Sequence, residues 1–212
     1  MITDDPGVVD LHKWEINTSI NSTITNQVQL AVPYIDANYG VFHNLQLKAE
    51  GPYLINIGSL NHTSGIGNIL LGVKFHFMDE NKNFVSAGIY PQYTINGNQK
   101  GLLFPLLLEK TFRHFLIGED VGYFFGENNF NGFQNGTLIG YKASEKIEIL
   151  GEYFIQANYK PVTAIDGFTN YGFRYVINKT FTLMGSFGTE ASTPKDQQRQ
   201  YFISFLGLQS DF

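Results

Sequence analysis

The stretch LGVKFHF at residues 71–77 alternates between apolar and other side chains. Successive side chains of a β-strand point to opposite faces of the sheet, so this stretch predicts a strand with one apolar and one more polar face. The same period of two recurs at 14–20, 45–50 and 171–177. No segment shows the 3.6-residue spacing of an amphipathic helix. The pattern therefore predicts an all-β protein.

Turn residues divide the chain into about twelve such strands. The predicted spans are 13–25, 28–41, 45–58, 69–78, 84–95, 102–112, 115–126, 133–143, 146–158, 169–177, 181–191 and 199–212. Short connections, such as 42–44, 79–82 and 113–114, alternate with connections that are mostly longer and richer in Gly and Asn. The longer set comprises 59–68, 96–101, 127–132, 159–168 and 192–198.

This alternation of connections is typical of outer-membrane barrels, which have short periplasmic turns and longer outer loops. An even number of strands also places both chain ends on the periplasmic side. We therefore predict a closed, antiparallel, up-and-down transmembrane β-barrel of about 12 strands over residues 13–212. Residues 1–12 are predicted to form an N-terminal periplasmic segment.

Composition excludes several other classes of protein. Aromatic residues make up 15% and charged residues 16% of the chain, which is unlike a disordered sequence. The longest apolar run, 102–108, is too short for a transmembrane helix. The absence of Cys excludes a disulfide scaffold and a Cys-based zinc site. With a net charge of −5 and no basic patch, nucleic acid is not an expected partner.

A soluble β-barrel or sandwich would show the same alternation with its faces inverted. Three features favour the membrane form: charged residues are scarce, the polar faces are rich in Gly, Asn, Ser and Thr, and aromatic residues gather near strand ends. A closed barrel also pairs every backbone N–H and C=O, as hydrocarbon requires. The expected aromatic girdle comprises Tyr34, Tyr39, Tyr90, Tyr93, Tyr123, Phe125, Tyr153 and Tyr159.

The two chain ends bear on localisation. The polar start at 1–7 has no apolar signal region, so either the protein is cytoplasmic or a start Met stands where a leader was cleaved. The barrel pattern favours the second choice and the bacterial outer membrane. The terminal Phe212 resembles the signal by which the barrel assembly machinery recognises its clients. The expected partners are outer-membrane lipids, lipopolysaccharide, that machinery and a small-molecule solute, and we expect a monomer.

Several short blocks resemble a known group of bacterial outer-membrane proteins. They are DDPG at 4–7 with WEIN at 14–17, DANYG at 36–40 with LQL at 45–47, and GIGN at 65–68 with GVKF at 72–75. The group is labelled "meta-pathway of phenol degradation" and is regarded as a set of candidate transporters. The resemblance implies a β-barrel and the passage of small molecules, with aromatic or hydrophobic ones as candidates. It implies no catalytic residues.

If the apolar faces meet lipid, the polar faces line the lumen. The charged and His side chains expected there, which would set selectivity, are Glu15, Asp36, Lys48, Glu50, Lys74, His76, Glu109, Lys142, Glu152 and Arg174. Glu50 with Lys74, and Glu152 with Arg174, are candidate cross-strand pairs. Such groups either line a narrow pore or form a salt-bridged plug, and twelve strands allow both. The sequence does not decide which side chains point into the lumen near Pro33, where a β-bulge is a candidate, or at the adjacent residues 119–120.

The function expected from these features is a channel or transporter for small solutes. The alternatives are a structural barrel with a plugged interior, and an outer-membrane lipid hydrolase. For the hydrolase, only His62 lies in an outer loop, with Ser59 and Ser64 nearby. Neither a G-x-S-x-G elbow nor an H-E-x-x-H metal motif occurs. We therefore expect no enzyme, no cofactor and no metal site; long adhesin-type outer loops are also absent from the pattern.

Overall fold

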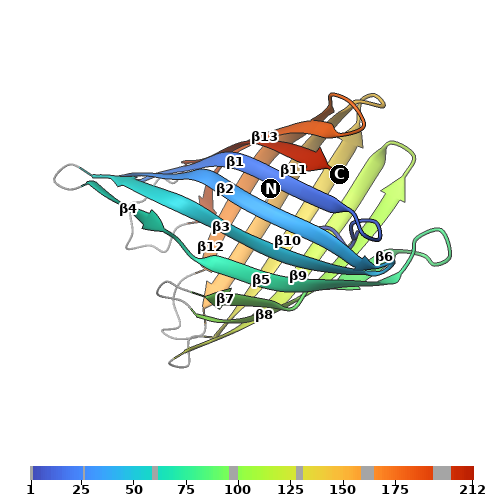
Figure 1. The fold of residues 1–212 in the computed structure, drawn as a ribbon, viewed down its shortest axis with the longest axis horizontal. Coiled ribbons are helices and arrows are strands. Elements are labelled where there is room, and N and C mark those ends of the chain that lie inside the picture. Colours follow the sequence, from blue (N-terminus) through green and yellow to red (C-terminus); the bar gives the residue numbers. More distant parts are fainter. Residues whose placement is uncertain are drawn as a thin grey trace.

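The computed structural model describes residues 2–25, 27–58, 62–95, 100–127, 131–158, 165–192 and 202–212. Within these residues the chain forms β-strands that wrap into one barrel (Figure 1). The strands are β1 (Trp14–Ile24), β2 (Val28–Phe42), β3 (Leu45–Ile57), β4 (His62–Ile66), β5 (Ile69–Met78), β6 (Ser86–Ile89), β7 (Gln92–Ile95), β8 (Gly101–Phe112), β9 (Phe115–Gly126), β10 (Asn131–Lys142), β11 (Ile147–Asn158), β12 (Ile165–Val176), β13 (Phe181–Ser192) and β14 (Phe202–Asp211).

The barrel is closed and antiparallel. The first strand β1 pairs with the last strand β14 and with β2, and the pairing of β3 with β5 completes the ring. The fourteen described segments make twelve wall strands, because β4 with β5, and β6 with β7, each form one interrupted strand. This confirms the predicted fold class. Among the described residues no helix is long and apolar enough to cross a membrane.

The two interruptions lie next to each other in the wall. Pro91 separates β6 from β7 and has no backbone N–H to donate to a ladder. Gly67 separates β4 from β5, and a Cβ there would lie 2.7 Å from Cγ of Pro52. The strand predicted over 69–78 matches β5, but β4 falls in the predicted loop 59–68. Similarly, β12 begins inside the predicted loop 159–168.

A bulge beside Pro33 settles the facing of β2. Opposite residues on paired strands point to the same side of a sheet. The lumen-lining Asn21 pairs with Ala31, whereas the lumen-lining Asn17 pairs with Asp36, and the register shifts between these pairs. Odd-numbered side chains therefore face inward before Pro33, and even-numbered side chains face inward after it. The bulge predicted from Pro33 is confirmed.

The start of the first strand, β1, and the end of the last strand, β14, lie together at the short-turn end of the barrel. The backbone N–H of Trp14 donates to the Phe212 carbonyl at 3.1 Å, and that of Phe212 donates to the Trp14 carbonyl at 2.9 Å. The connections at this end are 43–44, 79–85, 113–114, 143–146 and 177–180. The connection at 79–85 is longer than the predicted 79–82. Most of the longer outer loops lie outside the described residues.

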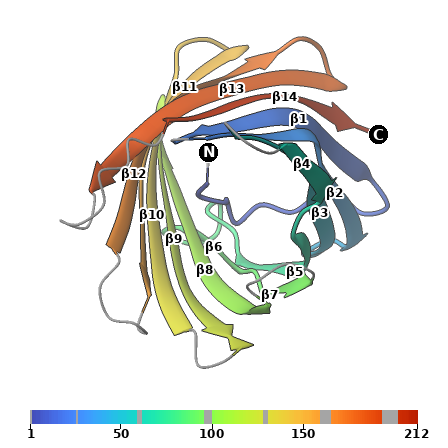
Figure 2. The same cartoon turned by 90° about the vertical axis from the view of Figure 1, so that its left-hand side faces the viewer.

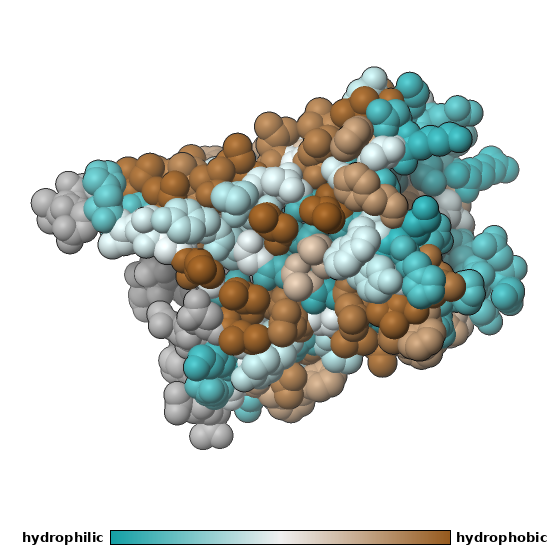
Figure 3. All heavy atoms as spheres, viewed as in Figure 1, coloured by the Kyte–Doolittle hydropathy of each residue, from teal (hydrophilic) through white to brown (hydrophobic). Residues whose placement is uncertain are grey.

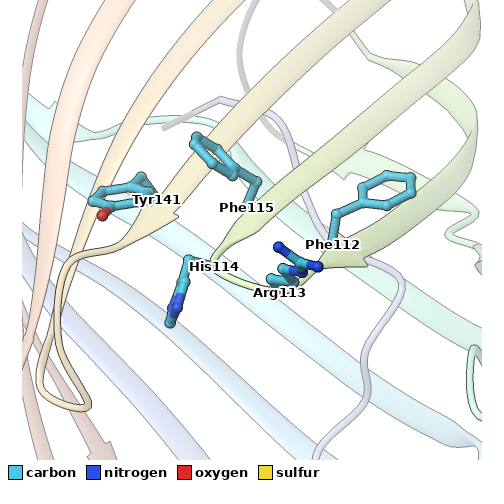
Figure 4. Close-up of a pocket in the computed structure, with 5 residues that line it drawn as sticks. All are labelled: Phe112, Arg113, His114, Phe115 and Tyr141. Carbon is cyan, nitrogen blue, oxygen red and sulfur yellow. The ribbon is translucent and has the colours of Figure 1, made fainter.

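Apolar side chains cover the outside of the barrel. Ile139 is 53% and Phe187 67% exposed, and many other large apolar side chains on the strands are similarly open. Figure 3 shows them spread over the wall, with hydrophilic residues gathered at the short-turn end. Figure 4 shows a hollow at the β8–β9 turn among the rings of Phe112, Phe115 and Tyr141. The outer face of the barrel is therefore suited to contact with lipid.

The predicted aromatic girdle needs correction at two positions. Tyr34 and Tyr90 line the interior of the barrel and do not belong to the outer surface. The bulge at Pro33 turns Tyr34 inward, and Tyr90 shares the inward face of its interrupted strand with Gly88 and Gln92. By contrast, Tyr93 and Tyr153 are exposed on the wall as a girdle requires. Tyr159 lies outside the described residues.

Candidate functional site

The N-terminal segment, residues 2–11, lies inside the barrel (Figure 2). The sequence analysis assigned residues 1–12 to an N-terminal periplasmic segment and did not place any of them in the lumen, so the position of residues 2–11 is a finding of the structure. The backbone N–H of Val9 donates to Gln46 Oε1 on β3 at 2.8 Å. At the far side of the lumen, the backbone N–H groups of Ile2, at 2.7 Å, and of Thr3 donate to Glu152 Oε1 on β11. The segment therefore crosses the interior from one wall to the other.

Glycines in the wall make room for this segment. A Cβ on Gly40 of β2 would lie 2.0 Å from the Asp10 carbonyl oxygen. A Cβ on Gly136 of β10 would lie 2.3 Å from Thr3 Oγ1, and one on Gly88 of β6 would lie 3.2 Å from the Pro6 carbonyl oxygen. Real Cβ atoms do not approach other atoms as closely as 2.0 or 2.3 Å, so a side chain at Gly40 or Gly136 would clash with the segment. The wall is thus shaped to the segment at three separate strands.

Asp4 carries the strongest ionic contact of the segment. Its Oδ1 lies 2.6 Å from Lys74 Nζ, and its Oδ2 lies 3.4 Å from Lys48 Nζ. Burial raises the pKa of Asp4, but the ammonium groups of Lys74 and Lys48 outweigh burial and hold that pKa well below its usual range. Asp4 is therefore a carboxylate at neutral pH, bridging two lysines.

Tyr90 forms the floor of this cluster. The Nζ atoms of Lys48 and Lys74 lie 5.3 Å and 5.4 Å from its ring centroid, within the range of cation–π contact. The ring lies over Gly72, where a Cβ would be 2.4 Å from Cε2 of Tyr90. Tyr90 is only 1% exposed, and its hydroxyl has no hydrogen-bond partner among the described residues. No sequence signal marks this residue as a lumen group, because Tyr at a strand end is typical of a girdle.

Acidic and amide side chains interlock on the β1 and β2 wall. Glu15 accepts from Asn17 at 3.0 Å and from Gln209 of β14 at 3.1 Å. Asp36 accepts from Asn38 at 3.0 Å and from Asn17 at 3.3 Å. Amide groups that bridge carboxylates satisfy buried polar atoms without neutralising their charge. This wall therefore presents a negative, hydrogen-bonded surface to the lumen.

The opposite wall mixes apolar and charged side chains. Its apolar contributions to the same cavity include Leu103, Leu116, Leu138, Leu150, Met184 and Phe205. A Cβ on Gly140 would lie 3.2 Å from Leu150 Cδ2 and 3.3 Å from Leu116 Cβ, so these leucines flank one glycine. The lumen is therefore two-sided: the described lining residues of β1 to β5 are polar or charged apart from Tyr34, whereas β8 to β11 add leucines between the charged residues Glu109, Asp120, Lys142 and Glu148. The sequence analysis considered only the charged residues and missed these leucines.

The cavity beside the segment has a volume of about 850 Å³. Its carboxylate residues outnumber its cationic ones, eight to four. The acids are Asp4, Asp5, Glu15, Asp36, Glu50, Glu109, Asp120 and Glu148, and the bases are Lys48, Lys74, Lys142 and Arg174. In a confined space with low-dielectric walls, such an excess produces a negative potential.

Most residues predicted for the lumen line this cavity: Glu15, Asp36, Lys48, Glu50, Lys74, Glu109, Lys142 and Arg174. Glu152 also faces inward, where it holds the segment and accepts a hydrogen bond from Asn170. His76 lies on the same strand face as Lys74, with Nε2 3.0 Å from Ser86 Oγ. Of the adjacent pair 119–120, Asp120 is the residue that lines the cavity.

Both predicted ion pairs are wrong. The register places Leu70 opposite Glu50, and Lys74 contacts Asp4. Glu50 instead lies 3.2 Å from Lys48 on its own strand. Arg174 stands opposite Glu148, at 3.9 Å, because the register sets Glu152 against Asn170. Strand order alone could not give these partners, since they depend on the register and on a segment with no periodic pattern.

The two described hydrolase candidates, His62 and Ser64, are not joined by any described hydrogen bond. His62 opens β4 on the outside, and the hydroxyl of Ser64 accepts a hydrogen bond from Tyr53 at 3.2 Å and makes no described contact with that His. Ser59, the other candidate, lies outside the described residues. Within the described ranges, no group of three or more His, Asp or Glu residues could hold a metal ion.

The chain matches no protein-family model and no curated protein. Its fold is similar to those of solved outer-membrane barrels. An outer membrane channel from Pseudomonas putida F1 is 10% identical, with 100% of both chains covered and a TM-score of 0.79. A KdgM porin in complex with disordered oligogalacturonate is 10% identical, with 92% of this chain and 99% of that chain covered and a TM-score of 0.69. A NanC porin is 8% identical, with 92% and 98% covered and a TM-score of 0.67. The chain thus has the fold of outer-membrane channels and porins, and the family suggested by the short sequence blocks stays a prediction.

Proposed function

We propose that the protein is a channel of the bacterial outer membrane that passes small solutes, with its N-terminal segment as the constriction. One observation carries this proposal: a charge-lined cavity of about 850 Å³ lies within a closed, outwardly apolar barrel, beside a segment that crosses it. A barrel built only as a structural element has no need of such a cavity. The solved barrels of similar fold include a channel and two porins, which supports the same reading.

The exterior supports the membrane location. An apolar wall of this extent would drive association of a water-soluble protein. In a bilayer the same wall is solvated by acyl chains, and closure of the barrel pairs the described wall strands on both sides, apart from the outer segment β4, which pairs with β3 alone. The short-turn end, with both ends of the ring, is then periplasmic.

The two-sided lumen indicates the kind of solute. The excess of carboxylates favours inorganic cations over anions in the open space. The leucines of β8 to β11 offer a surface for the apolar part of an organic solute. We propose that the cargo is a small molecule with both a polar and an apolar part. This agrees with the aromatic or hydrophobic solutes that the short sequence blocks imply.

A plugged structural barrel is the rival. Lys48 lies within 3.5 Å of carboxylate oxygens of Asp4, Asp36 and Glu50, and such a network can rigidify an interior. The two hypotheses differ in whether the N-terminal segment leaves the lumen. In the channel reading it leaves at least transiently, whereas in the structural reading it stays.

Planar-bilayer conductance of the purified protein tests the proposal. We expect small or intermittent conductance from the wild type, and larger, longer openings from Asp4→Asn combined with Glu152→Ala, because this variant removes two anchors of the segment. Glu80→Gln on the β5–β6 connection is the control and should conduct like the wild type. Absence of conductance in all three, with heat-modifiable gel mobility proving that each barrel is folded, would establish the plugged structural barrel instead.

The hydrolase alternative has a separate test. Purified protein is incubated with phospholipid or lipid A, and released products are quantified. We expect no turnover. Turnover that is lost in His62→Ala would show that the outer loop around this residue carries catalysis.

A further inference from the structure

Lys74 depends on the N-terminal segment for its charge balance. It is only 4% exposed. Its ammonium group contacts Asp4 Oδ1 at 2.6 Å and the Asp5 carbonyl at 2.9 Å, and among the described residues no other acceptor contacts it. If the segment leaves the lumen, Lys74 loses both of these contacts, and its ammonium group faces the cavity with no described protein acceptor.

Lys48 differs, because the wall neutralises it. Asp36 Oδ2 lies 3.5 Å and Glu50 Oε2 lies 3.2 Å from its Nζ. These wall acids remain when the segment leaves. Only Lys74 therefore needs a replacement anion when the segment leaves, although the charges that line the lumen sum to a negative value.

The geometry around Asp4 fits a carboxylate better than a monatomic anion. The two oxygens of Asp4 contact two different lysines, and both ammonium groups lie over the Tyr90 ring. Within the part of the chain that the structure describes, the Tyr90 hydroxyl is buried without a hydrogen-bond partner, so the cluster contains an unused donor. A carboxylate has enough acceptor sites to use both lysines and this hydroxyl.

The same cavity holds the apolar side chains of Leu103, Leu116 and Leu138. A ligand whose carboxylate replaced that of Asp4 could place an apolar body against them. Inorganic anions would gain nothing from the leucines. The combination selects a small organic acid with an apolar part.

We propose that Lys74, Lys48 and Tyr90 form a carboxylate-binding site that Asp4 occupies as an internal substitute, and that a small apolar carboxylate displaces Asp4 and releases the N-terminal segment. This inference rests on the proposed channel function and names its solute class. The solute would open its own path by taking over the contact that closes the lumen.

Thiol labelling of the segment measures its release. The chain has no Cys, so Thr3→Cys introduces a single thiol. Thr3 is 8% exposed against Gly136, and its hydroxyl has no hydrogen-bond partner in the described ranges, so the replacement sacrifices no described hydrogen bond of that side chain. A water-soluble maleimide should react only when the segment leaves.

Benzoate is the probe, and benzamide and chloride at equal ionic strength are the matched controls. We expect benzoate to raise the labelling rate saturably, by about tenfold, and the controls to leave it unchanged. In Lys74→Gln the starting rate should be higher and independent of benzoate. A rate that benzoate and benzamide raise equally, or that still responds to benzoate in Lys74→Gln, would overturn the proposal.

Calorimetry provides a test that needs no thiol. In Asp4→Asn the internal competitor is weakened, so benzoate should bind about tenfold more tightly than to the wild type. The double variant Asp4→Asn with Lys74→Gln should not bind it. If the protein conducts but benzoate neither binds Asp4→Asn nor speeds labelling, the carboxylate site is refuted and the channel stands. If benzoate binds and releases the segment while no variant conducts, the channel is refuted instead.

Discussion

Replacing Glu152 by Ala should release the N-terminal segment from the barrel wall. Glu152 is 5% exposed and accepts hydrogen bonds from the backbone N–H groups of Ile2 and Thr3. The variant removes both acceptors and leaves the two donors unpaired wherever the segment stays docked. Released into water, the donors are satisfied, so the equilibrium shifts toward release.

The size of the shift follows from these two contacts. A hydrogen bond to a charged group contributes about 1.5 kcal/mol or more to stability, so two such bonds amount to about 3 kcal/mol. Since about 1.4 kcal/mol corresponds to a factor of ten, the released fraction should rise roughly a hundredfold.

The assay is maleimide labelling of Thr3→Cys, alone and combined with Glu152→Ala. Glu148→Ala is the matched control, because Glu148 lies four positions away on the same face of β11, and its ion-pair partner is Arg174 of the wall. We expect the roughly hundredfold acceleration for Glu152→Ala and less than about threefold for Glu148→Ala. Equal rates in the two variants would refute the claim that Glu152 anchors the segment.

Three further expectations concern the segment and the lumen. Gly40→Ala should also speed Thr3→Cys labelling, because its Cβ would meet the Asp10 carbonyl oxygen at 2.0 Å, whereas Gly151→Ala, with nothing within 4 Å, should not; equal rates would contradict the fit of the segment to the wall. Glu109→Gln with Glu148→Gln should lower the cation preference of the channel, measured as a smaller reversal potential in a KCl gradient, and an unchanged potential would show that these carboxylates do not set selectivity. The pKa of Asp4 is lowered in the docked state, so its contribution to docking is complete above the ordinary pKa near 3.8 and is lost as the pH falls through the lowered pKa. The difference in open probability between the wild type and Asp4→Asn should therefore stay constant from about pH 8 to about pH 4 and shrink below it, and a loss of the difference near neutral pH would contradict this assignment.

Much of the fold could be predicted because alternation is a local property. The pattern at 71–77 indicates a strand by itself, and the same holds for 14–20 and 171–177. The facing of Lys74 and Arg174 followed from the same alternation, and both line the cavity. Pro33 also signalled its bulge, because Pro has no backbone N–H to donate to a ladder.

The ion pairs could not be predicted, because they depend on long-range register. A shift of four residues between β3 and β5 decides whether Lys74 meets Glu50 or Gln46, and the structure sets it opposite Gln46. The N-terminal segment has no period, so its sequence resembles an exposed tail. Its place in the lumen is marked only indirectly, by Gly40 and Gly136 at wall positions where a side chain would otherwise fit.

The central claim is that the barrel has its apolar side toward lipid and its wet side within. Spin labels on Gln134→Cys and Ile139→Cys test it on one strand, because Gln134 lines the cavity and Ile139 is 53% exposed on the outside. In lipid vesicles we expect the label at Ile139 to be relaxed by oxygen, which concentrates in acyl chains, and the label at Gln134 by a water-soluble nickel complex. The reverse pattern, or a protein that stays dispersed without detergent with both labels in water, would contradict the account.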